Sequence, residues 1–144
     1  MACADERAMP THVQWEPDFS VGHELIDTQH RNLLTQCNLL ADHCLGEASE
    51  DSDRRFDQSF DRFKALAREH FEAEESVLSS GGFPDLEDHR IECDEFEYLV
   101  GEVATTENFD RPELQRFLAL WWVGHIRGSA GLRRAFFAGG KRSA

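Results

Sequence analysis

Two residue pairs in the middle of the chain have the types and the spacing that metal sites on helices use. His70 and Glu74 are four positions apart, and so are His89 and Cys93. Residues four apart lie on one face of an α-helix, about 6 Å from each other along its axis, so one metal ion could contact both. Imidazole, carboxylate and thiolate groups all bind transition metals. The breakers SSGG and Pro84 separate the pairs, which predicts two helices with one donor pair each.

Helices that could position these pairs are indicated along most of the chain. Apolar residues recur with a helical period in four segments, which begin near Ser20 (a candidate N-cap), Phe56, Pro84 and Asp110. The last segment opens with DRPE, which resembles a capping box with proline in the first turn. Its predicted apolar stripe comprises Leu114, Phe117, Leu118, Trp121, His125, Leu132 and Phe136. With short linkers and no alternating strand pattern, the sequence predicts an all-α protein, an up-down-up-down antiparallel four-helix bundle with an N-terminal arm.

Each predicted helix carries one histidine on its apolar stripe: His30, His70, His89 and His125. A single histidine on such a stripe is more often a hydrogen-bonded core residue than a ligand. Four of them, with Glu74 also on the core stripe, are a different case, because buried polar groups are costly without partners. In an antiparallel bundle these side chains can reach one level of the core, so a shared metal is the simplest explanation.

The domain boundaries follow from the same stripes. We expect residues 1–14 to form a flexible N-terminal tail, residues 15–137 the bundle and residues 138–144 a flexible C-terminal tail. Trp15 and Phe19 precede the first helix and need apolar partners, which predicts an arm packed along the bundle.

Charge and composition exclude several classes of partner. The net charge of −13 argues against nucleic acid and anionic membrane surfaces, because both would repel the chain. No Asp or Glu follows Glu113, which indicates a basic helix end that favours the helix dipole, or a docking surface. The basic residues after it are Arg116, Arg127, Arg133, Arg134, Lys141 and Arg142. The lack of an apolar leader, of a long apolar run and of a Cys-x-x-Cys motif predicts a soluble, cytoplasmic protein, with no protein partner indicated.

Three segments resemble recurrent segments of the bacterial hemerythrins, four-helix-bundle proteins that bind dioxygen at a non-haem di-iron centre. They are WEPDFSVGHELIDTQH, HFEAEE with GGFPDLEDH downstream, and WWVGHI, and the similarity spans about residues 13–137. The resemblance implies that His30 and His70 bind one iron, that His89 and His125 bind the other, and that Glu74 bridges the two.

Two positions depart from the family pattern. Cys93 stands where the family has a histidine, and Ala130 stands where it has an aspartate. Cys93 could be a thiolate ligand or a small core residue. Asp27 and Glu97 lie near the site faces of their helices and could replace the lost carboxylate, or could be solvated or supporting carboxylates. Restoring both positions, by Cys93→His with Ala130→Asp, should restore loading with two irons.

A ligand pocket is expected beside the departures. Water or a small anion could enter the space above Ala130, where Ser129 could donate a hydrogen bond to a bound oxygen species. Trp121, one turn before His125, could wall this pocket, although a core role explains it equally well.

Three functions are compatible with this pattern. The first is a dioxygen-binding protein for oxygen transport, storage or sensing, with two irons in a centre of altered ligation and dioxygen or a related diatomic as its ligand. The second is an enzyme with one His/Cys-bound iron that acts on superoxide, peroxide or nitric oxide. The third is a structural or sensing module with one Fe or Zn. The sequence favours the first, a binding protein and not an enzyme.

Overall fold

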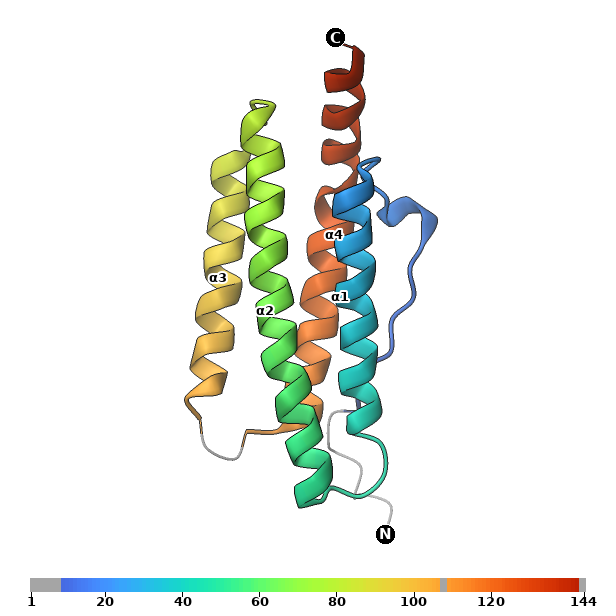
Figure 1. Ribbon diagram of the computed structural model, residues 1–144, viewed down its shortest axis with the longest axis vertical. Helices are drawn as coiled ribbons and strands as arrows, with labels where there is room; N and C mark the ends of the chain where they lie inside the picture. Colours follow the sequence, from blue (N-terminus) through green and yellow to red (C-terminus); the bar gives the residue numbers. More distant parts are fainter. Residues whose placement is uncertain (1–8, 107–108, 143–144) are drawn as a thin grey trace.

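A computed structural model describes residues 9–106 and 109–142 of the chain. Within these ranges the protein consists of four α-helices, preceded by one 3-10 turn, η2 (Pro17–Phe19). The helices are α1 (Glu24–His43), α2 (Glu50–Ser80), α3 (Leu86–Ala104) and α4 (Arg111–Arg142). Each helix runs opposite to the one before it (Figure 1). The all-α prediction and the antiparallel four-helix bundle are therefore confirmed.

The helix starts follow from local capping. Ser49 forms a capping box with Ser52 at the start of α2, and Asp110 Oδ1 accepts a hydrogen bond from Glu113 N at 3.0 Å at the start of α4. The predicted start of α1 at Ser20 is wrong, because the helix begins at Glu24 with His23 as its N-cap. Ser20 instead donates its hydroxyl to a residue within the helix, Asp27, at 2.6 Å.

The apolar stripes of the first three helices form most of the core, but Leu45, predicted on the first stripe, lies beyond the end of α1 and is 58% exposed. The stripe of α4 is rotated. Leu132 is 59% exposed, and Trp121 and Phe136 are only partly buried. The buried α4 residues are Leu114, Gln115, Leu118, Ala119, Trp122, His125, Ile126, Ala130, Arg133 and Phe137. The adjacent tryptophans made the register ambiguous, and the core takes Trp122, which is fully buried.

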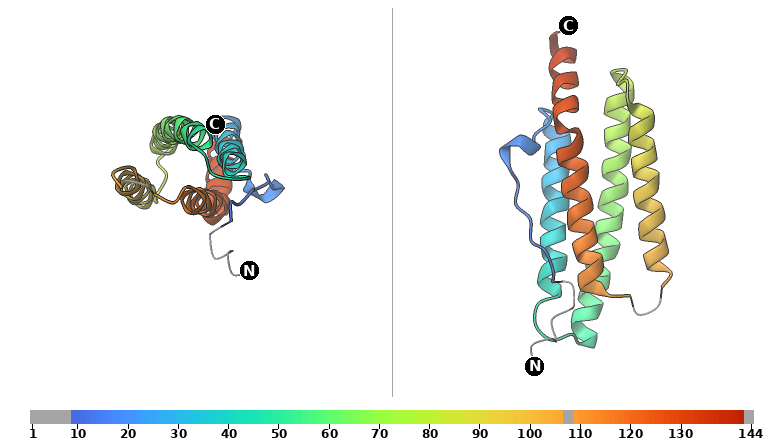
Figure 2. Two further views of the ribbon diagram at one scale, coloured as in Figure 1. Left: turned by 90° about the horizontal axis from the view of Figure 1, so that it is seen from below. Right: turned by 180° about the vertical axis from the view of Figure 1, so that it is seen from behind.

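The N-terminal arm lies along α1 and α4 (Figures 1 and 2). Trp15 packs edge-on against Phe19, with ring centroids 5.6 Å apart. The arm begins before the predicted boundary at residue 15. Thr11 N donates to Gln115 Oε1 on α4 at 2.7 Å, and Val13 N donates to Asn38 Oδ1 on α1 at 2.8 Å. The earlier part of the predicted N-terminal tail, residues 1–8, lies outside the described ranges.

The C-terminal end also differs from the sequence prediction. α4 continues to Arg142, so residues 138–142 are helical where a tail was predicted from residue 138. Figure 1 shows this helix extending past the end of α1. None of the helices in the described ranges is both long enough and apolar enough to cross a membrane.

Candidate metal centre

All four helices contribute to one cluster of polar side chains inside the bundle. The predicted ligands are His30 on α1, His70 and Glu74 on α2, His89 and Cys93 on α3, and His125 on α4. The four histidines and the glutamate are buried, with at most 4% of each residue exposed. Antiparallel packing thus brings residues from distant parts of the sequence to one level of the core.

Glu74 stands at the centre of this cluster. Its Oε1 lies 2.8 Å from His89 Nε2, 3.2 Å from His125 Nε2 and 3.5 Å from His70 Nε2. Its Oε2 lies 3.7 Å from His30 Nε2. Burial alone would raise the pKa of Glu74, but the charge of His125 and the close imidazoles of His125, His70 and His89 hold that pKa well below its ordinary value. The carboxylate is therefore ionised and faces an imidazole from every helix.

The cluster has the size and the chemistry of a cation site. The ligand atoms of His30, His70, Glu74 and His125 all lie within 4.8 Å of one another. Both ring nitrogens of His30, Nε2 of His70 and Oε2 of Glu74 are buried without a hydrogen-bond partner in the described part of the chain. Native proteins leave few buried polar atoms in this state, and each such atom calls for an explanation. A bound metal supplies one, so the donor set fits a cation.

Two further side chains orient the imidazoles. Gln29 Oε1 lies 2.8 Å from Nδ1 of His70, and Glu92 Oε1 is in hydrogen-bond contact with Nδ1 of His125. When Nδ1 donates to these oxygens, Nε2 is left as the acceptor that points to the cluster, which is the usual arrangement of metal-binding histidines. The sequence prediction missed both residues. Their only signal was a place next to a predicted ligand, since Gln29 precedes His30 and Glu92 precedes Cys93.

Comparison with known proteins identifies the family. Residues 21–130 match the family described as Hemerythrin HHE cation binding domain. The chain belongs to the hemerythrin family. It is accordingly a hemerythrin-family cation-binding protein with a buried His/Glu cluster.

Individual relatives are distant but cover most of the chain. The hemerythrin-like protein of Naegleria gruberi is 26% identical over 84% of this chain and 90% of its own length. The myohemerythrin of Theromyzon tessulatum is 26% identical with the same coverage, 84% and 90%. The bacteriohemerythrin of Stenotrophomonas maltophilia is 27% identical over 79% of this chain and 74% of its own length. No solved structure gives a significant match.

Cys93, the first departure from the hemerythrin pattern, lies beside the cluster. Its Sγ is 3.6 Å from His89 Nε2. Burial, followed by the negative charges of Glu74 and Glu92, raises the pKa of this thiol, so without a metal Cys93 is protonated. It is not one of the four residues whose ligand atoms lie within 4.8 Å of one another. Ligation by Cys93 therefore stays a prediction.

Ala130, the second departure, is buried. Three residues further along α4 is Arg133, which the sequence prediction assigned to the basic helix end. Arg133 is only 3% exposed, and its Nη1 lies 3.8 Å from Glu74 Oε2. Its burial could have been suspected from its spacing, because it stands eight residues after His125 and three after Ala130, on the same face of α4.

The two acids considered as replacements for the missing aspartate have other partners. Asp27 accepts hydrogen bonds from Ser20 Oγ and from Val21 N at 2.9 Å, and so fastens the arm to α1. Glu97 pairs with Arg68 across the α2–α3 surface at 3.7 Å. Neither belongs to the group of close ligand atoms around Glu74.

Aromatic rings enclose the α4 side of the cluster. Trp121 stacks on the His125 ring, with centroids 5.1 Å apart and planes 10° apart. Trp122, which the sequence prediction did not select, packs against His125 and His70, with centroids 5.2 and 5.7 Å away, and stacks with Phe71. Ser129 was also predicted for the pocket, but its side chain lies outside the described part of the structure.

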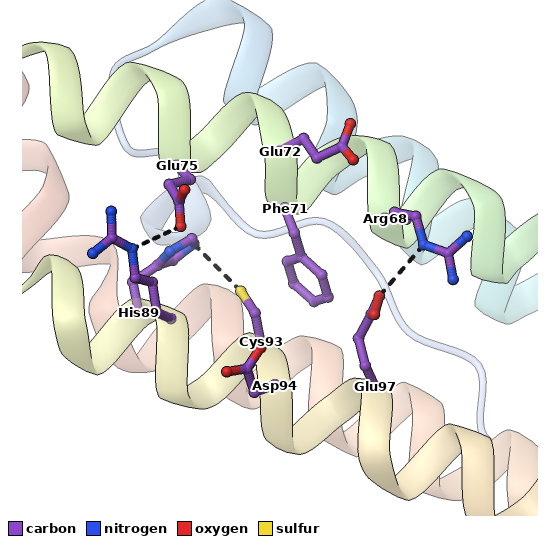
Figure 3. Close-up of a pocket in the computed structure, with 9 residues that line it drawn as sticks. Arg68, Phe71, Glu72, Glu75, His89, Cys93, Asp94 and Glu97 are labelled. Carbon is purple, nitrogen blue, oxygen red and sulfur yellow. Dashed lines mark hydrogen bonds and ion pairs between the residues drawn. The ribbon is translucent and has the colours of Figure 1, made fainter.

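A cavity of about 390 Å³ opens between α2 and α3, beside the cluster. Its inner wall includes His89, Cys93 and Phe71, and Figure 3 shows Cys93 pointing toward His89 from α3. Its rim is charged, with Glu72, Glu75, Asp94 and Glu97 outnumbering Arg68 and Arg90. The cavity thus reaches from the surface to His89, the cluster histidine of α3.

The metal-free protein should lose stability as the pH falls below about 6.5. Burial lowers the pKa values of His30 and His70 from 6.5 in the folded chain, so the unfolded chain takes up their protons first and is favoured by acid. His125 acts in the opposite sense, because Glu74 outweighs its burial and raises its pKa. Two lowered pKa values against one raised value predict a net loss, measurable as the urea midpoint at about pH 7.5 and about pH 5.5.

His30→Ala should make the urea midpoint of the metal-free protein depend less on pH, because one of the two lowered pKa values is removed. The matched control is His12→Ala, since His12 is half exposed and pairs with Asp42 at the surface. A urea midpoint that rises between about pH 7.5 and about pH 5.5 would contradict the expectation and would mean that His125 dominates.

Proposed function

We propose that the cluster binds iron and that the protein binds dioxygen or a related neutral diatomic, as an oxygen carrier, store or sensor. The observation that carries the proposal is the buried group of His30, His70, Glu74 and His125, whose ligand atoms lie within 4.8 Å of one another and include ring nitrogens without partners. Imidazole with carboxylate suits iron among the transition metals. Membership of the hemerythrin family supports the same metal. Iron held there would supply a ferrous/ferric couple and an open position for a small ligand.

The residues around the cluster suit a small, neutral ligand. Phe71 and Trp122 are buried against the imidazoles and keep the α4 side apolar. On the α2–α3 side, Glu72, Glu75, Asp94 and Glu97 give the cavity an excess of negative charge. That charge repels anions such as superoxide but has little effect on dioxygen or nitric oxide, because these carry no net charge. This argument favours binding of a neutral diatomic over reduction of superoxide.

The test is to isolate the protein without air, measure its metal content and record its absorption spectrum before and after oxygen is admitted. We expect iron, and a visible band that appears with oxygen and disappears when oxygen is removed. His70→Ala should abolish both the iron and the band, because His70 faces Glu74 and is held in place by Gln29. His12→Ala, at the surface, should change neither.

Other outcomes would point to the alternative functions. A colourless protein loaded with zinc would contradict the proposal and favour a structural or sensing module. Catalytic consumption of superoxide or peroxide by the iron-loaded protein, without a reversible band, would favour an enzyme instead.

A further inference from the structure

Arg133 is a positive charge placed inside the metal cluster. Its side chain is 3% exposed, in the same range as the four histidines, and its Nη1 lies 3.8 Å from Oε2 of Glu74. Burying a guanidinium is costly unless an anion and hydrogen bonds compensate it, so a buried arginine is retained only where something balances its charge. The carboxylate of Glu74 is an anion that faces it.

Ala130 provides the room for this arginine. It lies three residues before Arg133 on α4, is 3% exposed, and carries only a methyl group. Side chains on a helix tilt toward its N-terminus, so a long side chain at position 133 covers the turn that contains position 130. The place where the resemblance calls for a bridging carboxylate is therefore next to a guanidinium.

The charge of the core argues against two metals. In the described part of the chain, Glu74 is the carboxylate among the close ligand atoms, and Glu92 adds a second negative charge through its contact with His125. One divalent ion together with Arg133 already exceeds the negative charge of these two carboxylates. A second divalent ion would add two further positive charges to a buried site, close to a fixed cation. Charges of like sign repel strongly at low dielectric, so the second ion is disfavoured.

The arrangement of the donors fits the same conclusion. The hemerythrin resemblance divides the histidines into one pair for each iron, with His30 and His70 apart from His89 and His125. Here the ligand atoms of His30, His70 and His125 lie together with Glu74 within 4.8 Å, across that division. With bonds of about 2.0–2.2 Å, two atoms on one metal ion are at most about 4.4 Å apart, so a contraction of a few tenths of an ångström would let a single ion bind the whole group.

We propose that the guanidinium of Arg133 takes the place of one metal of the family centre, so that this chain holds a single metal ion and a fixed cation around Glu74. The proposal rests on the proposed function in one respect, that the cluster binds a metal. It revises the expectation that Cys93→His with Ala130→Asp is enough to restore two irons. A carboxylate introduced at position 130 would meet the guanidinium, three residues away on the same face, and would pair with it.

The experiment is anaerobic loading with ferrous iron, followed by mass-spectrometric counting of iron per chain. We expect about one iron in the native chain and about one in the Cys93→His, Ala130→Asp variant. Adding Arg133→Met removes the charge but keeps much of the side-chain length, and should raise the count to about two. Adding Arg133→Lys instead keeps the charge and should leave about one. Arg116→Met, an exposed position on α4, is the matched control for the native chain and should change nothing.

Each result decides for or against the proposal. Two irons in the native chain would overturn it without any variant, and so would one iron in the chain that carries Arg133→Met together with both restored positions, provided that its circular dichroism remains helical. The oxygen-dependent spectrum separates the two proposals. One iron without an oxygen-dependent band would overturn dioxygen binding and leave the role of Arg133 standing. Two irons with such a band would support dioxygen binding and overturn the role of Arg133.

Discussion

Glu74→Gln is expected to abolish tight metal binding and to lower the free energy of unfolding of the metal-free protein by about 3–5 kcal/mol. The substitution keeps the shape of the side chain and removes its charge. Glu74 faces imidazoles from all four helices and lies 3.8 Å from Nη1 of Arg133, so its loss leaves these groups buried without the anion at their centre. Urea unfolding and a metal-binding titration would measure both effects.

A double-mutant cycle would show how much of that cost comes from Arg133. Glu74→Gln combined with Arg133→Met removes both charges, so the double variant should be more stable than Glu74→Gln alone. Glu72→Gln, an exposed position on the same helix, is the matched control and should have little effect. If Glu74→Gln were as stable as Glu72→Gln, the central place given to Glu74 would be wrong.

Glu92→Ala should weaken metal binding by about 10- to 100-fold while leaving every proposed ligand in place. Glu92 contacts Nδ1 of His125, and burial, which would raise its pKa, is outweighed by that hydrogen bond, so the pKa of Glu92 is lowered and the carboxylate is ionised. Without it, the His125 ring is free to take the other tautomer and to rotate. Competition with a chelator of known affinity would measure the change in dissociation constant.

The control for this variant is Glu95→Ala, on the exposed side of the same helix. Gln29→Ala should act in the same direction as Glu92→Ala, because Gln29 holds Nδ1 of His70 in the same way. Equal affinity in Glu92→Ala and Glu95→Ala would show that the contact with His125 does not tune the site.

The sequence predicted the elements of the fold because local periodicity determines them. His30, His70 and Glu74 fall at helical positions among apolar residues, so their burial could be inferred from spacing alone, before any tertiary contact was known. The same reasoning failed on α4, where Trp121 and Trp122 are adjacent and periodicity could not decide which one faces the core.

The side chains that balance charge in the site could not be predicted in this way. Arg133 belongs to a run of basic residues whose charge alone predicts an exposed helix end. It is nevertheless buried, and its Nη1 lies 3.8 Å from Glu74 Oε2 on another helix. Glu92 is separated from His125 by 33 positions, so no local pattern connects the pair. Contacts of this kind are products of the assembled bundle.

The cavity beside Cys93 has a consequence for the speed at which the centre can respond. It leads from the surface between α2 and α3 to His89, whose Nε2 lies 2.8 Å from Glu74 Oε1, so a gas molecule can approach this edge of the cluster without separation of the helices. Entry would then be limited by side-chain motions on the picosecond-to-nanosecond scale, whereas opening of a whole domain takes from less than a second to days. A rigid, tightly packed bundle can in this way equilibrate with a small ligand far faster than it unfolds and exposes its core to water.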